Sequence, residues 1–299
     1  MPSHTTPALL ALLALPLTLM GCSSADSVSD SASSASSSPS LSSSASSGEA
    51  AGSDDEGSTT TVERFEANVI ERVPFDASLF TQGLEVTPNG EVLVGTGQYG
   101  ESGIFTLPVG SDSAQQHVGN EDDVFGEGLT QYDSADGPLI WQLSWDSGEA
   151  YKYDAESYEL LDTVSYPGEG WGLCSVDDSS TLVMSDGTNE LRHLDGESFE
   201  EQSRVPVTLD GQAVDNINEL ECVGGEVFAN VWFSTDILRI DPATGEVTGI
   251  VDASGLENNA EEDPDHVLNG IAHIPDTDEY FLTGKRWPDM YRVSFDPIS

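Results

Sequence analysis

Residues 125–130 read Phe-Gly-Glu-Gly-Leu-Thr, and the tripeptide at the centre of this stretch recurs in altered form along the chain. The five copies are Gln82-Gly83-Leu84, Glu127-Gly128-Leu129, Trp171-Gly172-Leu173, Asn218-Glu219-Leu220 and Asn269-Gly270-Ile271. Their last residues are 45, 44, 47 and 51 positions apart. Near-constant spacing of this length indicates an architecture built from one repeated structural unit.

Each tripeptide is followed by short apolar runs that have the composition of strands. The second run of each repeat is Val92–Gly95, Ile140–Trp145, Leu182–Ser185, Val227–Trp232 or Tyr280–Thr283. The third is Ile104–Val109, Ala150–Tyr153, Glu190–Leu194, Ile237–Ile240 or Met290–Val293. In several repeats a turn, such as residues 241–245, leads to a fourth run, as at Val247–Val251. Four short strands per repeat are typical of β-propeller blades.

These repeats predict an all-β fold, a five-bladed β-propeller that occupies residues 62–299. The opening strand, Val62–Val73, has no repeat ahead of it, and the sequence stops after the third run of the last repeat. We therefore expect the N-terminal strand to complete the last blade and close the ring, which removes exposed strand edges. A β-sandwich is the alternative, but it does not account for the regular spacing.

The residue before the glycine of each repeat is expected at a common height in the wall of the central channel. The first strand of a blade lines that channel, and glycine lets neighbouring backbones approach closely near the axis. The residues at this position are Gln82, Glu127, Trp171, Asn218 and Asn269. One acid, one aromatic and three amides predict a polar pocket at the channel mouth; the alternative is a water-filled channel lined by unrelated polar residues.

The chain of 299 residues is strongly acidic, with 9 Lys+Arg against 54 Asp+Glu and a formal net charge of −45. So few cations, without a basic cluster, argue against binding to nucleic-acid phosphates and against polybasic contact with a membrane. Charge of this size self-repels at low ionic strength and is tolerated better in concentrated salt. We therefore expect a salt-adapted protein, with an ordinary acidic extracellular protein as the alternative. Only two lysines, Lys152 and Lys285, are present.

Residues 1–21 resemble a lipoprotein signal peptide. The apolar run Ala8–Met20 is shorter than the roughly 20 residues that span a bilayer, and it ends in the lipobox-like Leu-Met-Gly-Cys at Cys22. We predict lipidation of Cys22 and a Ser-rich, acidic, disordered tether over residues 22–61. The protein would then be extracytoplasmic and held to the cell membrane by its lipid alone. The alternative is an ordinary cleavable signal with no lipid.

The remaining cysteines, Cys174 and Cys222, fall at nearly matching places in neighbouring repeats. Export permits a disulfide between them, but two buried small hydrophobic residues are an equally consistent interpretation. The histidines of the mature chain are scattered and no CxxC motif is present, so we expect no zinc site.

Ten short motifs follow one another between Arg72 and Tyr291, and they include Phe80–Glu85, Gly95–Gly100, Phe125–Thr130, Tyr166–Leu173, Ala229–Trp232 and Thr283–Pro288. In this order they resemble the glutaminyl-peptide cyclotransferases of the plant and bacterial type, a family of five-bladed propellers. The resemblance implies an enzyme that converts the N-terminal glutamine of peptides or proteins to pyroglutamate and releases ammonia. It implies no required cofactor and no catalytic metal.

The resemblance also assigns roles to individual residues. Glu127 matches the family's catalytic acid and is the expected general acid/base, while Lys285 matches its active-site lysine, which could stabilise an oxyanion. The expected substrate-binding residues are Phe80, Gln82, Trp145, Trp171, Asn218, Trp232 and Asn269. Trp287 also matches, but we expect it to be structural. The acidic stretch Asp252–His266 is expected to disfavour acidic peptides at the mouth.

The expected partners are peptides or proteins with an N-terminal glutamine, and the expected oligomeric state is a monomer. A structural Ca²⁺ in the oxygen-lined channel is left open, since acids and amides are suitable ligands. Two other functions are the alternatives. A non-catalytic surface propeller that binds peptides or carbohydrate would be marked by loss of the Glu127 and Lys285 pair, which this chain keeps. A metal-dependent, lactonase-like propeller would lose its activity to a chelator.

Overall fold

The computed structural model describes residues 61–176 and 180–298, and all regular structure in these ranges is β-strand. The prediction of an all-β fold is confirmed. Within the same ranges, no helix is long and apolar enough to cross a membrane. The predicted signal peptide, the lipidated Cys22 and the tether up to residue 60 lie outside the described residues and stay predictions.

Three antiparallel sheets have four strands each, in the order of the sequence. The first contains β2 (Thr81–Val86), β3 (Glu91–Thr96), β4 (Gly103–Pro108) and β5 (Gln115–Gly119). The second contains β6 (Gly126–Ser134), β7 (Gly137–Ser144), β8 (Glu149–Asp154) and β9 (Leu160–Ser165). The third contains β10 (Leu173–Ser175), β11 (Thr181–Ser185), β12 (Glu190–Asp195) and β13 (Glu201–Pro206). A small hairpin of β14 (Thr208–Leu209) and β15 (Gln212–Ala213) follows.

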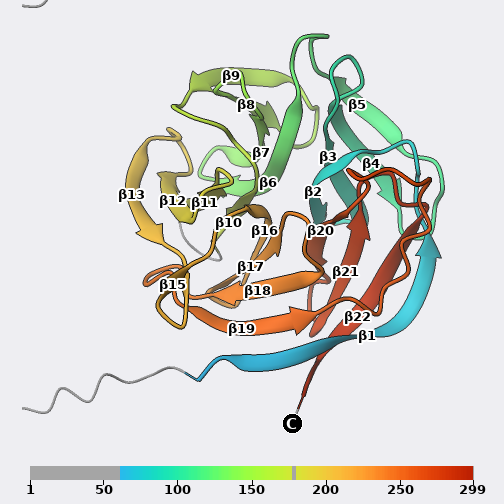
Figure 1. Ribbon diagram of the computed structural model, residues 1–299. Coiled ribbons are helices and arrows are strands. Elements are labelled where there is room, and N and C mark those ends of the chain that lie inside the picture. The colour runs from blue at the N-terminus through green and yellow to red at the C-terminus, as the bar shows by residue number, and fades with distance from the viewer. Residues whose placement is uncertain (1–60, 177–179, 299) are drawn as a thin grey trace, which may run out of the picture. The chain divides into compact units, whose positions relative to one another are not determined.

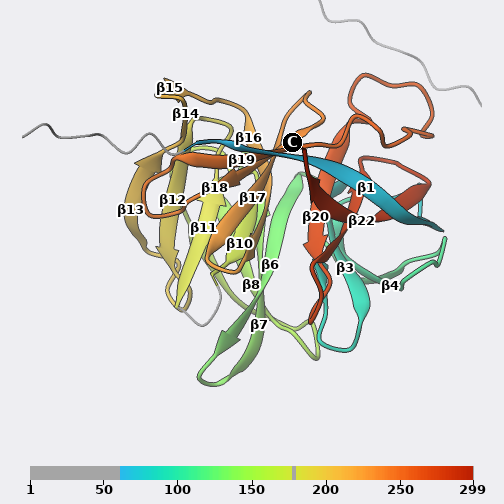
Figure 2. The same ribbon diagram turned by 90° about the horizontal axis from the view of Figure 1, so that it is seen from below.

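The remaining strands form one eight-stranded sheet, in the order β16-β17-β18-β19-β1-β22-β21-β20. Their bounds are β16 (Ile217–Val223), β17 (Glu226–Val231), β18 (Asp236–Ile240), β19 (Val247–Asp252), β1 (Glu63–Pro74), β22 (Asp289–Pro297), β21 (Glu279–Gly284) and β20 (Leu268–His273). β1 pairs antiparallel with β22 along most of its length and parallel with the end of β19. The first strand of the domain is therefore joined to the last one, as Figure 2 shows.

The sheets are arranged around a common centre, where β2, β6, β10, β16 and β20 lie (Figure 1). Each of these inner strands contacts the next one around, and β20 contacts β2. Apolar side chains fill the space between neighbouring sheets; one cluster, for example, joins Val183 and Leu191 of the third sheet to Leu220 and Ala229 of β16 and β17. The core is thus divided among the contacts between sheets, and the inner strands surround the centre.

Glycine after the first residue of the repeat allows the inner backbones to meet. A Cβ on Gly128 would lie 2.6 Å from the carbonyl oxygen of Trp171, and the Gly128 N–H donates to that same oxygen at 2.8 Å. A Cβ on Gly172 would lie 2.2 Å from the carbonyl oxygen of Asn218. Close backbone approach therefore explains the glycines, as the repeat pattern predicts.

The fourth repeat has Glu219 in place of glycine, and its side chain makes the contacts that backbones make elsewhere. The Glu219 carboxyl oxygens accept hydrogen bonds from the backbone N–H of Leu84 at 3.3 Å and of Ile271 at 2.9 Å. The side chain thus links β16 to both β2 and β20. Complete burial raises the pKa of Glu219 well above its ordinary value, although the two N–H donors oppose this shift.

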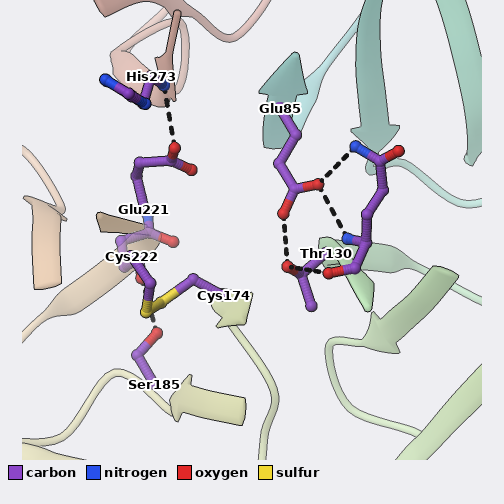
Figure 3. The surroundings of a disulfide bond; sticks show 9 residues. Glu85, Thr130, Cys174, Ser185, Glu221, Cys222 and His273 are labelled. Carbon is purple, nitrogen blue, oxygen red and sulfur yellow. Dashed lines mark hydrogen bonds between the residues drawn. A yellow bond between two sulfur atoms is a disulfide. The ribbon is translucent and has the colours of Figure 1, made fainter. Parts of the chain in front are cut away.

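Cys174 of β10 and Cys222 of β16 form a disulfide, with 5.4 Å between their Cα atoms (Figure 3). The sequence leaves open whether these cysteines are bonded or are two buried thiols, and in the structure they are bonded. The bond joins the inner strands of two neighbouring sheets.

Candidate active site

The beginnings of the inner strands surround a cavity of about 290 Å³. Eight of its eleven lining residues are residues that the sequence singled out: Phe80, Gln82, Glu127, Trp145, Trp171, Asn218, Trp232 and Lys285. Gln98, Phe125 and Asp265 complete the wall. Small-molecule sites have volumes of roughly 300–1,000 Å³, so a cavity at the lower end suits a single amino-acid side chain.

Glu127 is the second residue of β6 and is only 5% exposed. The Nε2 of Gln82 donates a hydrogen bond to its Oε1 at 2.8 Å. Burial raises the pKa of Glu127 well above the ordinary value; the positive charge of Lys285 works in the opposite direction, and the negative charge of Glu169 adds to the rise. This carboxyl group therefore retains its proton to a higher pH than an exposed glutamate does.

The Gln82 amide is oriented from behind by Asn269. Asn269 Nδ2 donates to the Oε1 of Gln82 at 3.1 Å and to the backbone oxygen of Thr81 at 3.0 Å. With its oxygen engaged, Gln82 directs Nε2 at Glu127. Asn269 itself is completely buried and is absent from the cavity wall, in contrast to the other residues predicted to bind substrate. Asn269 lies behind Gln82, where its amide nitrogen donates to the side-chain oxygen of Gln82 instead of facing the cavity.

Lys285 directly follows β21 and is 6% exposed. Its Nζ lies 5.1 Å from the centre of the Phe80 ring, a cation–π contact. Burial lowers the pKa of Lys285, while the charges of Glu127 and Asp265 oppose that decrease. The only other lysine, Lys152, is on β8 and binds the exposed Glu197 at 3.5 Å. Lys285 is therefore the lysine that shares the cavity with Glu127.

The aromatic wall is held by an acid that the sequence analysis did not assign. The indole nitrogens of Trp145 and Trp171 both donate to the same oxygen of Glu169, at 2.9 Å each. Trp171 also meets Trp232 edge-on, with 5.5 Å between ring centres. Phe125 packs against Trp145 in the same way. The three tryptophans thus form one connected wall, and Trp145 and Trp232 each lie one residue beyond the strand that was predicted to include them.

Several loops at the cavity have backbone conformations that L-residues rarely adopt. Gln98 lines the cavity at φ 85°, and Arg286 next to Lys285 has φ 61°. Asn216 and Phe233, which lie close to Asn218 and Trp232, have φ 66° and 64°. Backbone strain of this kind concentrates at functional sites, where the surrounding structure holds it.

Sequence reasoning missed Gln98, Phe125, Asp265 and Glu169 as site residues, and the signals for them differ. Gln98, Phe125 and Glu169 lie inside motifs that carried the family resemblance, so they could have been considered. Asp265 belongs to the acidic stretch expected beside the mouth. Trp287, by contrast, packs in the core, where its indole nitrogen donates to the backbone oxygen of His266 at 3.1 Å.

In residues 61–176 and 180–298, no group of three or more His, Cys, Asp or Glu side chains is arranged to hold a metal ion. The arrangement that the cavity does provide is a buried carboxyl group, a buried ammonium group and amide donors between apolar walls. Such a site can move a proton and stabilise negative charge on an oxygen.

Comparisons with known proteins show the family to which the chain belongs. The family model described as glutamine cyclotransferase matches residues 40–295. A glutaminyl-peptide cyclotransferase of Arabidopsis thaliana is 32% identical over 239 residues, which cover 78% of this chain and 72% of the relative. The crystal structure of Myxococcus xanthus glutaminyl cyclase matches with a TM-score of 0.73 and 35% identity, over 80% of this chain and 100% of that one.

The fold and the cavity define an all-β protein with a buried carboxyl group and a buried ammonium group in one small cavity. The chain belongs to the glutamine cyclotransferase family.

Proposed function

We propose that the chain is a glutaminyl-peptide cyclotransferase, which cyclises the N-terminal glutamine of peptides or proteins to pyroglutamate and releases ammonia. The family and both relatives support this activity. The observation that carries the mechanism is the buried Glu127 in one small cavity with Lys285.

In the proposed reaction, the α-amine nitrogen of the glutamine attacks its own γ-carboxamide carbon. A C–N bond forms, and the electron pair of the carbonyl π bond moves to the oxygen. The attack is intramolecular and makes a five-membered ring, so proximity is largely built into the substrate. The enzyme is left with three tasks: to take a proton from the amine, to stabilise the oxyanion and to protonate the leaving nitrogen.

Glu127 performs the first and third of these tasks. Its carboxylate accepts the proton of the attacking amine, and the resulting carboxylic acid donates that proton to the leaving nitrogen as the carbonyl reforms and ammonia departs. One group serves twice because its pKa is raised by burial towards that of the amine it serves.

Lys285 stabilises the oxyanion with its positive charge. No ion pair directly joins Lys285 to Glu127 among the described residues, although each shifts the pKa of the other. Gln82 and Asn218 provide amide groups to hold the substrate. The tryptophans exclude water, which strengthens the electrostatic interactions of Glu127 and Lys285 in the cavity. Asn269 acts through Gln82 as a positioning residue.

We also propose the finer description of the fold. The three four-stranded sheets and the two halves of the eight-stranded sheet, β16–β19 and β20–β22 with β1, are the five blades of a propeller. The cyclic order of contacts between the inner strands supports this assignment. The pairing of β1 with β22 supports closure by the N-terminal strand.

The remaining proposals concern the setting: a monomer, adapted to salt and held at the extracytoplasmic side of the membrane by a lipid on Cys22. The lipobox-like sequence and the charge of −45 support them. Replacement Cys22→Ala should move the protein from the membrane fraction to the soluble fraction. Continued sedimentation of that variant with membranes would contradict the anchor.

The activity is tested by incubating the purified protein, in high salt, with a glutamine-initiated dipeptide amide. We expect stoichiometric ammonia and pyroglutamyl product, with an unchanged rate in the presence of EDTA. Binding without turnover would favour the non-catalytic propeller. Loss of the activity to EDTA would favour a metal-dependent mechanism and would reopen the question of Ca²⁺ in the channel.

A further inference from the structure

The aromatic wall of the cavity continues outward onto the surface through Phe233. Trp171 meets Trp232 edge-on inside the cavity, and Phe233 stacks on Trp232 with 4.3 Å between ring centres and 27° between planes. Phe233 is absent from the cavity wall and is 61% exposed. One apolar surface therefore leads from the cavity to solvent.

The backbone holds the Phe233 ring in this exposed position. Phe233 has φ 64°, a left-handed conformation, at the turn between β17 and β18. The N–H groups on either side are engaged: Trp232 donates to the Asn216 oxygen at 2.9 Å, and Ser234 donates to the Val231 oxygen at 2.9 Å. A conformation that costs free energy for a residue other than glycine thus places a large apolar side chain in water beside the cavity.

The reaction determines which part of a substrate passes this point. Cyclisation uses the α-amine and the γ-carboxamide of the first residue, so both must lie in the cavity with Glu127. The peptide continues only from the main-chain carbonyl of that residue. Because the cavity is small, at about 290 Å³, the second residue of the peptide lies at the mouth.

We propose that Phe233 contacts the side chain of the second residue of the peptide and that the enzyme favours a large apolar or aromatic side chain there. This inference rests on the proposed function. Tyr99, another exposed aromatic residue near the cavity in the described part of the chain, suits this role less well. It is 48% exposed and meets Phe125 edge-on, and its hydroxyl group donates to Asp146 at 2.8 Å.

The test is a substrate series measured with wild type and Phe233→Ala: glutamine amide, Gln-Gly-amide and Gln-Phe-amide. We expect wild type to prefer Gln-Phe-amide. The variant should lose about 5- to 10-fold in kcat/KM on that substrate alone, the scale of one aromatic contact. Phe233→Tyr keeps the ring and should retain the preference. Leu161→Ala removes another exposed apolar side chain, 52% exposed and on β9, so it controls for unspecific surface effects.

The outcomes separate this inference from the proposed function. An equal loss of kcat/KM on all three substrates would show that Phe233 only supports Trp232 inside the cavity, and would overturn the inference while leaving the activity intact. No loss on Gln-Phe-amide would overturn it as well. Failure of wild type to release ammonia from any of the three would contradict the proposed function itself, and the inference with it.

Discussion

The inner strands carry acidic residues at both of their ends, and the surroundings of these acids differ between the two ends. The strands begin at the cavity that contains Glu127, and they end at a second cavity of about 970 Å³. Each inner strand contributes at least one polar residue to this second cavity, among them Glu85, Gln131, Ser175, Glu221 and His273. Residues of the repeats therefore line a polar site at each end of the inner strands.

Glu85 shows how a partly buried carboxyl group is bound at the second end. Its oxygens accept hydrogen bonds from the Thr130 hydroxyl, from the Gln131 backbone N–H at 2.9 Å and from the Gln131 side chain at 3.0 Å (Figure 3). Burial raises its pKa to about 7, although these donors oppose the rise. All three donors belong to β6, so Glu85 fastens β2 to its neighbour.

Within residues 61–176 and 180–298, Glu127 has one side-chain donor, Gln82, and a lysine that shares its cavity. A carboxyl group with several fixed donors is a structural link, whereas one with few partners and a nearby cation can exchange protons with a substrate. The two carboxyl groups thus differ in their partners, and also in exposure, since Glu127 is 5% exposed and Glu85 is partly buried.

Exchange of each acid for its amide tests this difference most strongly. Glu127→Gln should lower kcat by about 10²- to 10⁴-fold, because an amide cannot carry the proton. Glu85→Gln should leave kcat within a few-fold of wild type. The measurement is ammonia release, with circular dichroism as the check on folding. Similar losses in both variants would remove the distinction between the two ends.

The two lysines offer the next comparison. Lys285→Met should lower kcat by about 10²- to 10³-fold, the usual effect of removing a group that stabilises an oxyanion. Lys152→Met is the matched control, because Lys152 of β8 binds Glu197 in the turn between β12 and β13 and does not line the cavity. A Lys285→Met enzyme with wild-type kcat would exclude Lys285 from the chemistry.

The disulfide is expected to contribute to stability. Its removal by the double substitution Cys174→Ser and Cys222→Ser should lower the free energy of unfolding by about 2–4 kcal/mol. Denaturant titration of wild type and the double variant measures this difference. An unchanged midpoint and slope would mean that the contacts of β10 and β16 hold these strands without the bond.

A smaller effect per pH unit is expected in the pH dependence of stability that Glu85 causes. Its pKa is about 7 in the folded protein and near 4.5 in an exposed glutamate, so the folded state binds more protons between these values. The contribution of neutral Glu85 to the free energy of unfolding is therefore fully present below pH 4.5. It is lost as the pH rises towards 7, by at most about 1.4 kcal/mol per pH unit. Unfolding of Glu85→Gln across the same range should lack this slope. A parallel dependence in both proteins would assign it to other groups.

The sequence repeats predicted much of the site because they fix strand positions. Gln82, Glu127 and Asn218 share one place in the repeat, and the strands bring all three to one cavity. Asn269 occupies the same place but lies behind Gln82, because the contact between their two amides decides its direction. The position of a residue in the repeat predicts how far along the central channel it lies. The hydrogen-bond partner of its side chain decides whether that side chain faces the cavity.

Contacts between segments that are far apart in the sequence could not be predicted from the repeats. Glu169 joins Trp145 and Trp171 from the exposed connection between β9 and β10. The bond between Cys174 and Cys222 likewise depends on the packing of β10 against β16. Neither spacing nor composition gives these distances, since both depend on how separate sheets meet.

The claim that Glu127 carries the proton is tested most directly by the pH dependence of kcat/KM. The carboxylate form is required, so the rate should fall as pH falls through a pKa raised above that of an ordinary glutamate. Lys285 lowers the pKa of Glu127, so Lys285→Met should move this inflection to higher pH, while Glu85→Gln leaves it in place. Ionisation of the substrate's α-amine affects the pH profile of kcat/KM equally in every variant. An inflection that stays fixed in Lys285→Met, or that moves in Glu85→Gln, would contradict the assignment of Glu127.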